Sequence, residues 1–189
     1  VNMAWGLGLG IIIDGNLYYG KSGFSGEFGH FCMFENEVLC HCGKKGCLET
    51  EASGSAFHRI LIERYREGSN TILAGKLDSG EEISLGDLLE AVRKEDVLCI
   101  DILEKMGVNL GKGIAGLMNI FNPELVILGG TLSLAGEYIS LPIKSAIRKY
   151  SLNLVNQDTE IKISKLGERA GAFGACLLSR SKLLGMIHY

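Results

Sequence analysis

The sequence lacks the features that mark membrane-spanning, secreted and nucleic-acid-binding chains. It contains no run of about 18 or more apolar residues, so no membrane span is expected. It also lacks a leader in which charged residues precede an apolar stretch. Its 19 basic and 22 acidic residues leave a net charge of only −3, and the basic residues are scattered. Because phosphate binding needs basic residues gathered on one face, we expect no direct contact between this chain and DNA.

The bulk composition is that of a globular domain with a sizeable core. The chain has 189 residues, 47% of them hydrophobic and 22% charged, which excludes an intrinsically disordered chain. A domain of this size needs no disulfide cross-links, so its six cysteines are expected to be reduced thiols in the cytoplasm. The first residue is Val1 rather than Met, which predicts a piece of a longer protein. No internal repeat or linker divides the sequence, and we expect one domain over residues 1–189.

The pattern of apolar residues and turns predicts an α/β fold. Residues 3–20 are expected to form two strands joined at Asp14 and Gly15, because this dipeptide accepts the positive φ of a tight hairpin. Ser84 and Asp87 have the spacing of a capping box that begins a helix. The other expected elements are a helix over 48–68, a polar surface loop over 68–84, a long helix from residue 98 that ends before Pro123, a short buried strand over 125–130, a helix over 138–150, a strand over 160–166 and a final helix over 170–184. This alternation indicates a mixed or parallel sheet flanked by helices.

The long helix carries one apolar stripe and four glycines. The stripe repeats at steps of three or four residues: Leu103, Met106, Leu110, Ile114, Leu117 and Phe121. A glycine inside a helix costs up to about 1 kcal/mol relative to alanine. We therefore expect a neighbouring element to pack closely at four positions, Gly107, Gly111, Gly113 and Gly116. In the first strand, Gly6, Gly8 and Gly10 leave one face bare, which predicts close approach of another group there.

Most of the chemically active residues lie in "GEFGHFCMFENEVLCHCGKKGCLE", residues 26–49, which holds four of the six cysteines and two of the four histidines. Cys40, Cys42 and Cys47 form a C-x-C-x4-C pattern, in which "GKKG" lets the backbone turn sharply. Three thiolates leave one corner of a tetrahedron for His30, ten residues before Cys40. This set predicts a Cys3His zinc site, which is structural because protein ligands fill all four positions.

Other interpretations of these residues stay open. The cysteines could instead form a disulfide or remain buried thiols. Cys32 and His41 are rival metal ligands in the same loop. Cys99 and Cys176 each lie in a helical apolar run and are expected to pack in the core.

Glu27 and Glu49 flank the metal loop and suggest a ligand with many hydroxyl groups. Zinc bound to one ring nitrogen of His30 leaves the other nitrogen with a proton that it donates in a fixed direction. Each carboxylate can accept hydrogen bonds from two neighbouring hydroxyls. Glu27, His30 and Glu49 are therefore candidate binding residues for a polyhydroxylated ligand, although surface glutamates are often only solvated charges.

"SGEFGH" followed by "CHCGKKGCLETEASG" resembles the ROK family of bacterial sugar kinases and sugar-responsive transcriptional repressors. "GLGLGIIIDGNLYYG", "NPELVILGG" and "AGAFGACLLS" also resemble segments of this family. The resemblance implies an actin-like, ribonuclease H-like fold of two lobes with sugar bound between them, and this chain corresponds to the C-terminal lobe. It also implies that Glu27, His30 and Glu49 contact sugar, and that His30, Cys40, Cys42 and Cys47 bind zinc.

The chain departs from the kinase pattern at the phosphate-binding turn. Family kinases have Gly-Thr-Gly there, whereas this chain has Ala4, Trp5 and Gly6, or Gly6, Leu7 and Gly8 if the alignment shifts by two. Either alignment removes the Thr hydroxyl and indicates a damaged phosphate site. Gly129 and Gly130 occupy the position that lies beside the nucleotide in the family. Two glycines are also typical of a tight turn after a strand.

These observations favour a sugar-sensing lobe of a ROK repressor, with a sugar or sugar phosphate as effector. The resemblance implies a homodimer or higher homo-oligomer, and DNA binding only through a domain outside this chain. The catalytic Asp of the family belongs to the N-terminal lobe, so this chain holds no catalytic base of its own. The alternatives are the C-terminal lobe of an ATP-dependent sugar kinase, or a family member in which zinc merely holds the loop.

Overall fold

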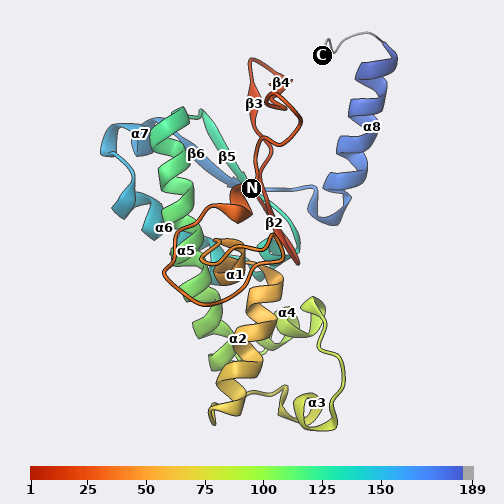
Figure 1. The fold of residues 1–189 in the computed structure, drawn as a ribbon, viewed down its shortest axis with the longest axis vertical. Coiled ribbons are helices and arrows are strands. Elements are labelled where there is room, and N and C mark those ends of the chain that lie inside the picture. Colours follow the sequence, from red (N-terminus) through yellow and green to blue (C-terminus); the bar gives the residue numbers. More distant parts are fainter. Residues whose placement is uncertain (185–189) are drawn as a thin grey trace.

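The computed structural model describes residues 1–184 and has an α/β arrangement, in which short strands lie beside a pair of long packed helices (Figure 1). The helices are α1 (Glu49–Ala52), α2 (Gly54–Arg66), α3 (Ala74–Ser79), α4 (Leu85–Arg93), α5 (Val97–Phe121), α6 (Glu137–Tyr150), α7 (Asn153–Asp158) and α8 (Ala170–Leu183). Short 3₁₀ turns lie at Phe28–His30, Thr131–Ala135 and Gly167–Arg169. The strands are β1 (Asn2–Met3), β2 (Leu7–Gly8), β3 (Ile12–Ile13), β4 (Asn16–Leu17), β5 (Leu125–Leu128) and β6 (Glu160–Ile163). None of the helices within 1–184 combines the length and hydropathy that a bilayer span requires.

The strands form a mixed set, as expected. β5 and β6 pair in parallel, whereas β1 and β2 pair antiparallel. Met3 N donates to the carbonyl of Gly129 at 2.8 Å, and Gly129 N donates to the carbonyl of Val1 at 2.9 Å. These two bonds place β1 beside the end of β5. The expectation of a buried strand at 125–130 was wrong for Leu125 and Ile127, whose face of β5 is left exposed.

The opening segment contains two hairpins rather than the single one expected. The turn at Asp14 and Gly15 is confirmed, because both residues have positive φ, 51° and 77°, between β3 and β4. A second turn, formed by Ala4, Trp5 and Gly6 and called the Trp5 turn below, interrupts the predicted first strand between β1 and β2. The carbonyls of this turn accept hydrogen bonds from the first amides of α2, which explains why the strand does not continue through it.

The predicted helix over 48–68 is divided at Ser53. This residue is extended, and its hydroxyl accepts a hydrogen bond from Ala56 N at 3.2 Å, so it caps α2 and separates it from α1. The predicted loop over 68–84 contains the short helix α3. The capping box is confirmed: Ser84 Oγ accepts from Asp87 N, and the Asp87 carboxylate accepts from Ser84 N.

The core is built on α5, as its apolar stripe predicts. Leu103, Met106, Leu110 and Ile114 are buried, whereas Phe121 at the end of the helix is about half exposed, which the stripe did not predict. Figure 1 shows α6 alongside α5, and the glycines allow their close approach. A Cβ atom on Gly111 would lie 2.5 Å from the carbonyl of Ile143. The expectation of close packing therefore holds for three of the glycines, Gly107, Gly111 and Gly113, and was wrong for Gly116, which faces open space.

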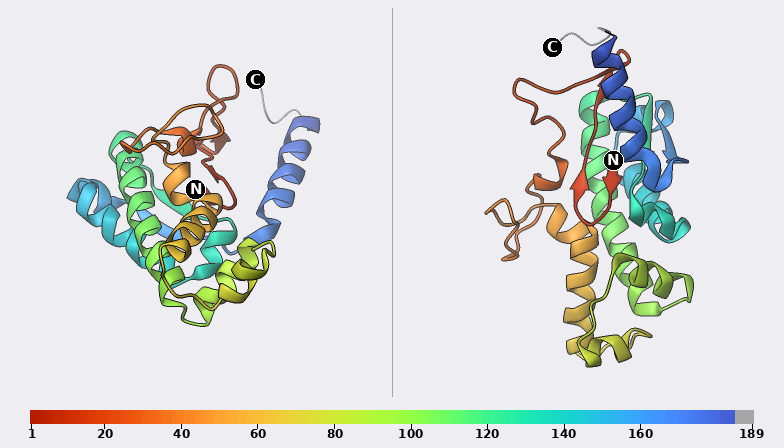
Figure 2. Two further views of the ribbon diagram at one scale, coloured as in Figure 1. Left: turned by 60° about the horizontal axis from the view of Figure 1, so that its bottom comes forward. Right: turned by 90° about the vertical axis from the view of Figure 1, so that its right-hand side faces the viewer.

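Helix α8 stands apart from the rest of the molecule (Figures 1 and 2). None of its described residues is buried. The expectation that Cys176 packs in the core was therefore wrong, because nothing within residues 1–184 covers that side of α8. Cys99 on α5 is buried as expected, and burial raises the pKa of its thiol well above the usual range.

We expect Gly111→Ala to destabilise the protein by about 1–3 kcal/mol, since its new methyl group would overlap α6. Gly116→Ala is the matched control on the same helix, and it should be neutral or stabilising by up to about 1 kcal/mol. Urea unfolding followed by circular dichroism measures both effects. Equal destabilisation by the two variants would contradict the assigned packing of α5 on α6.

Candidate metal centre and acidic rim

The metal loop, residues 26–49, is held in shape by backbone hydrogen bonds between its two ends. Leu48 N donates to the carbonyl of Phe31 at 2.9 Å, and Met33 N donates to that of Gly46 at 2.8 Å. Gly46 has φ 77°, and a Cβ there would lie 2.1 Å from the Phe34 carbonyl, so this crossing requires glycine. The loop thus brings His30 and the cysteines near its second end to one place.

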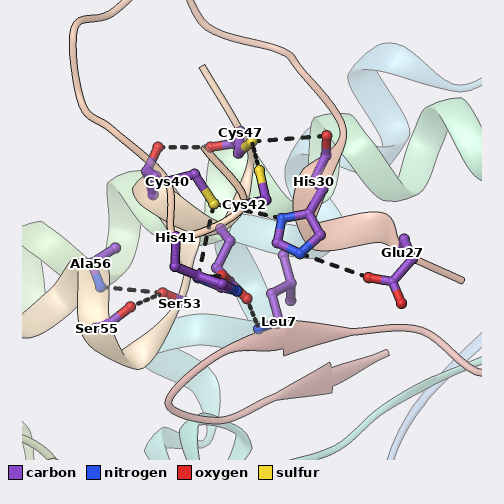
Figure 3. Close-up of polar contacts among 12 residues, drawn as sticks. Leu7, Glu27, His30, Cys40, His41, Cys42, Cys47, Ser53, Ser55 and Ala56 are labelled. Atoms are coloured by element: carbon purple, nitrogen blue, oxygen red, sulfur yellow. Dashed lines mark hydrogen bonds and ion pairs between the residues drawn. The ribbon is translucent and has the colours of Figure 1, made fainter. Parts of the chain in front are cut away.

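The four predicted ligands form one cluster (Figure 3). One ligand atom from each of His30, Cys40, Cys42 and Cys47 lies within 4.8 Å of the others. Cys40 Sγ is 3.5 Å from His30 Nδ1, and Cys42 Sγ is 3.6 Å from Cys47 Sγ. Ligands of a tetrahedral zinc ion lie about 2.0–2.3 Å from the metal, and hence roughly 3.5 Å from one another. The spacing therefore fits a tetrahedral ion held by three sulfurs and one nitrogen.

The alternative ligands and a disulfide fit less well. All six cysteines are free thiols. Cys32 Sγ lies outside the cluster, 3.6 Å from the carbonyl of Lys45. His41 is closer: its Nδ1 is 3.9 Å from Cys40 Sγ, and it forms a second, overlapping group with His30 and Glu49. The structure thus brings His41 into the site, where it pairs with Glu49 rather than joining the group of four ligands.

Two thiols of the cluster have opposite pKa shifts. Burial, together with hydrogen bonds from the neighbouring thiols, raises the pKa of Cys47 to about 12. A hydrogen bond from the backbone of Lys44 lowers the pKa of Cys42. A cation is what stabilises several thiolates at this spacing, so metal binding and ionisation of the cysteines are coupled.

The acidic rim, defined as Glu27 and Glu49, lies on the His30 side of the cluster. Figure 3 shows the His30 ring between Cys40 and Glu27, with Nδ1 toward Cys40 and Nε2 toward Glu27. The distance from Nε2 to Glu27 Oε2 is 3.7 Å. One ring therefore lies between the cysteine cluster and an exposed carboxylate.

Glu49 is buried, and both of its carboxylate oxygens have partners. Oε2 accepts a hydrogen bond from Leu7 N at 2.8 Å, and Oε1 pairs with His41 Nδ1 at 3.0 Å. A Cβ on Gly6 would lie 2.9 Å from Oε2, so the predicted close approach at this glycine is confirmed. At Gly8 and Gly10 that prediction was wrong, since nothing lies within 4 Å. The partners of Glu49 were missed by sequence reasoning, although the glycines beside Leu7 gave a signal for one of them.

Comparison with known proteins identifies the family of this chain. The profile of the ROK family matches residues 1–182. The chain belongs to the ROK family. It is 35% identical to a glucokinase of Halalkalibacterium halodurans, over 92% of this chain and 53% of that protein. It is 33% identical to the xylose repressor of Caldicellulosiruptor bescii, over 97% of this chain and 46% of that protein.

A solved structure shows the same ROK fold. The crystal structure of a ROK transcriptional regulator, a homologue of the E. coli MLC protein, superposes with a TM-score of 0.78 at 36% identity. The match covers 86% of this chain and 40% of that one. The α/β, actin-like fold expected from the sequence is thereby confirmed, and the chain spans about half the length of the curated relatives it matches.

Gly129 pairs with Asn2 in a parallel bridge after β5, and Gly130 precedes the 3₁₀ turn at Thr131–Ala135; each lies against the opening segment. Gly130 has φ 87°, and a Cβ there would lie 2.4 Å from the carbonyl of Met3. Close packing against β1 therefore explains why glycine is needed at this position. A role of the pair beside a nucleotide, as in ROK kinases, stays a prediction.

We expect the metal-free chain to take up about one equivalent of Zn²⁺, since the four ligands fill one tetrahedral site. Cys42→Ser should weaken this uptake more than about tenfold, because a thiolate is lost. Cys32→Ser, in the same loop but outside the cluster, is the matched control and should keep native affinity. Competition with a chromogenic chelator measures all three proteins. Equal loss in both variants, or no uptake by the native chain, would contradict the ligand assignment.

Proposed function

We propose that this chain is the sugar-sensing, zinc-containing, dimer-forming lobe of a cytoplasmic ROK transcriptional repressor. The observation that carries the proposal is the position of His30, whose two ring nitrogens face the cysteine cluster and Glu27. The Trp5 turn, which stands where ROK kinases bind phosphate, adds the preference for a repressor. The DNA contacts are proposed to come from a domain outside this chain.

Zinc suits the cluster because three thiolates and one imidazole select it over harder cations. Bound there, it supplies no reaction step, since protein ligands fill the site. With a metal on Nδ1, His30 would carry its proton on Nε2, the nitrogen nearer to Glu27.

The acidic rim suits a sugar because its groups match neighbouring hydroxyls. His30 Nε2 donates, while Glu27 accepts with a largely exposed carboxylate. Glu49 is fixed by Leu7 N at one oxygen, so the other can exchange His41 for a ligand hydroxyl. Relatives named for glucose and xylose support a sugar as the ligand class.

The Trp5 turn favours a repressor over a kinase. Three backbone amides of the β1–β2 hairpin already donate hydrogen bonds. Met3 N donates to the carbonyl of Gly129, Ala4 N to the carbonyl of Gly6, and Leu7 N to the carboxylate of Glu49. A phosphate cradle needs such amides to point at the anion. The rival function, the C-terminal lobe of an ATP-dependent sugar kinase, is favoured by the identity with a glucokinase, and MgATP binding discriminates between the two.

A repressor of this kind works by a shift between states. A sugar that binds one arrangement of the two lobes more tightly draws the population toward it. The affinity of the DNA-binding domain for DNA then changes, because sugar binding and DNA binding are linked by one coupling free energy.

The sugar proposal is tested by Glu27→Gln in the whole protein, titrated calorimetrically with glucose and with xylose. We expect at least one sugar to bind, and Glu27→Gln to weaken it about tenfold or more, because hydrogen bonds to a charged group contribute about 1.5–3 kcal/mol. Glu35→Gln, an exposed residue of the same loop, is the matched control and should bind like the native protein. Removal of the metal should weaken binding in parallel.

Absence of binding by native and variant proteins alike would leave zinc with only a loop-holding role. Unchanged sugar affinity in metal-free protein would separate the metal from the acidic rim.

The kinase alternative is tested with the whole protein, MgATP and glucose. We expect no saturable MgATP binding and no glucose-dependent release of ADP, because the turn lacks the Thr hydroxyl and the amide of Ala4 is already bonded to the carbonyl of Gly6. A coupled ADP assay measures this, with a characterised glucokinase as the positive control. Turnover of glucose would refute the repressor assignment.

A further inference from the structure

A cavity of about 340 Å³ lies directly beside the acidic rim. Trp5, His41, Glu49, Ser55 and Arg59 are among the residues that line it. This volume falls within the range of about 300–1,000 Å³ that small-molecule sites occupy. The residues proposed above to bind a sugar explain only its Glu49 side.

The cavity and the acidic rim share Glu49, and His41, which also lines the cavity, pairs with it. Polar atoms of His30, His41 and Glu49 lie within 4.8 Å of one another. His41 is exposed and pairs with the Glu49 oxygen that faces away from Leu7. A ligand seated on the rim can therefore extend past His41 into the cavity.

Part of the cavity lining is the indole ring of Trp5, whose backbone is held in place by hydrogen bonds. Trp5 is the only tryptophan of the chain and is 53% exposed. Its carbonyl accepts a hydrogen bond from Ser55 N at 2.9 Å, which attaches the Trp5 turn to α2. The indole lies next to the ring of His58, with centroids 5.8 Å apart. An exposed aromatic ring held in this way offers a flat apolar surface at low entropic cost, which suits the C–H face of a pyranose ring.

The polar groups of the cavity are suited to hydroxyls and unsuited to a phosphate. Arg59 donates to the Thr50 carbonyl at 2.7 Å and to Glu63 at 2.7 Å, and Glu51 lies 3.5 Å from its second terminal nitrogen. These carboxylates compensate its charge, while the guanidinium keeps further N–H donors. Because the Glu49 carboxylate also lines the cavity, a neutral polar ring is favoured over an anion.

We propose that this cavity is a second sugar subsite, and that the effector is a neutral disaccharide or longer saccharide whose second ring packs on Trp5. The inference rests on the proposed sugar function and narrows it, since it disfavours a sugar phosphate. The first ring lies on the acidic rim, the glycosidic link passes His41, and the second ring meets Trp5 and Arg59.

The test compares monosaccharides with their disaccharides in the whole protein. Glucose is paired with cellobiose and with maltose, and xylose with xylobiose, in calorimetric titrations. At least one disaccharide should bind about tenfold more tightly than its monosaccharide, a difference of about 1.4 kcal/mol that a contact with an aromatic ring can supply. Trp5→Ala should bring this affinity ratio to about one, whereas Trp5→Tyr should keep most of it.

A direct readout guards against variants that fail to fold. In protein labelled with 5-fluorotryptophan, the ¹⁹F resonance missing from Trp5→Tyr belongs to Trp5, and it should shift with the disaccharide and not with the monosaccharide. The second subsite alone would be overturned if sugars bound with an affinity that depends on Glu27, but disaccharides bound no more tightly than monosaccharides and the ¹⁹F resonance of Trp5 did not shift. No binding of any of these sugars would overturn the proposed sugar function together with it.

Discussion

The arrangement of the site depends on a single imidazole ring. His30 lies between a set of sulfur atoms and a carboxylate, with Nδ1 3.5 Å from Cys40 Sγ and Nε2 3.7 Å from Glu27. An imidazole has two distinct nitrogens. If a metal binds one of them, the proton of the neutral ring must lie on the other, which can then donate a hydrogen bond. The loop that carries it is closed by backbone hydrogen bonds between its ends, and Phe28 and Leu48 anchor those ends in the core.

A second constraint joins the site to the fold. Glu49 begins α1, its carboxylate holds Leu7 in β2, and the Trp5 turn before β2 is bonded to the start of α2. Glu49, the Trp5 turn and the first two strands are therefore parts of one hydrogen-bonded unit. In the same unit, Gly6 leaves the space that the carboxylate needs.

The features predicted correctly from the sequence were those encoded by neighbouring residues. The ligand cluster follows from a short loop in which Cys40, Cys42 and Cys47 have little freedom to separate, and the Ser84 cap follows from a local hydrogen bond. The Leu7–Glu49 bond joins residues 42 positions apart, and no local pattern specifies it. Cys176 was misplaced because helical spacing shows which residues share a face, but not whether another element covers that face.

The hydrogen bond between Leu7 and Glu49 affects how genetic variants at the site are interpreted. Loss of the Glu49 carboxylate strands a buried amide, at a cost of about 1–3 kcal/mol, in addition to any lost ligand contact. A phenotype at position 49 thus mixes misfolding with altered recognition. The exposed Glu27 carries no such backbone bond, so a screen of position 27 reports on recognition with far less interference from protein abundance.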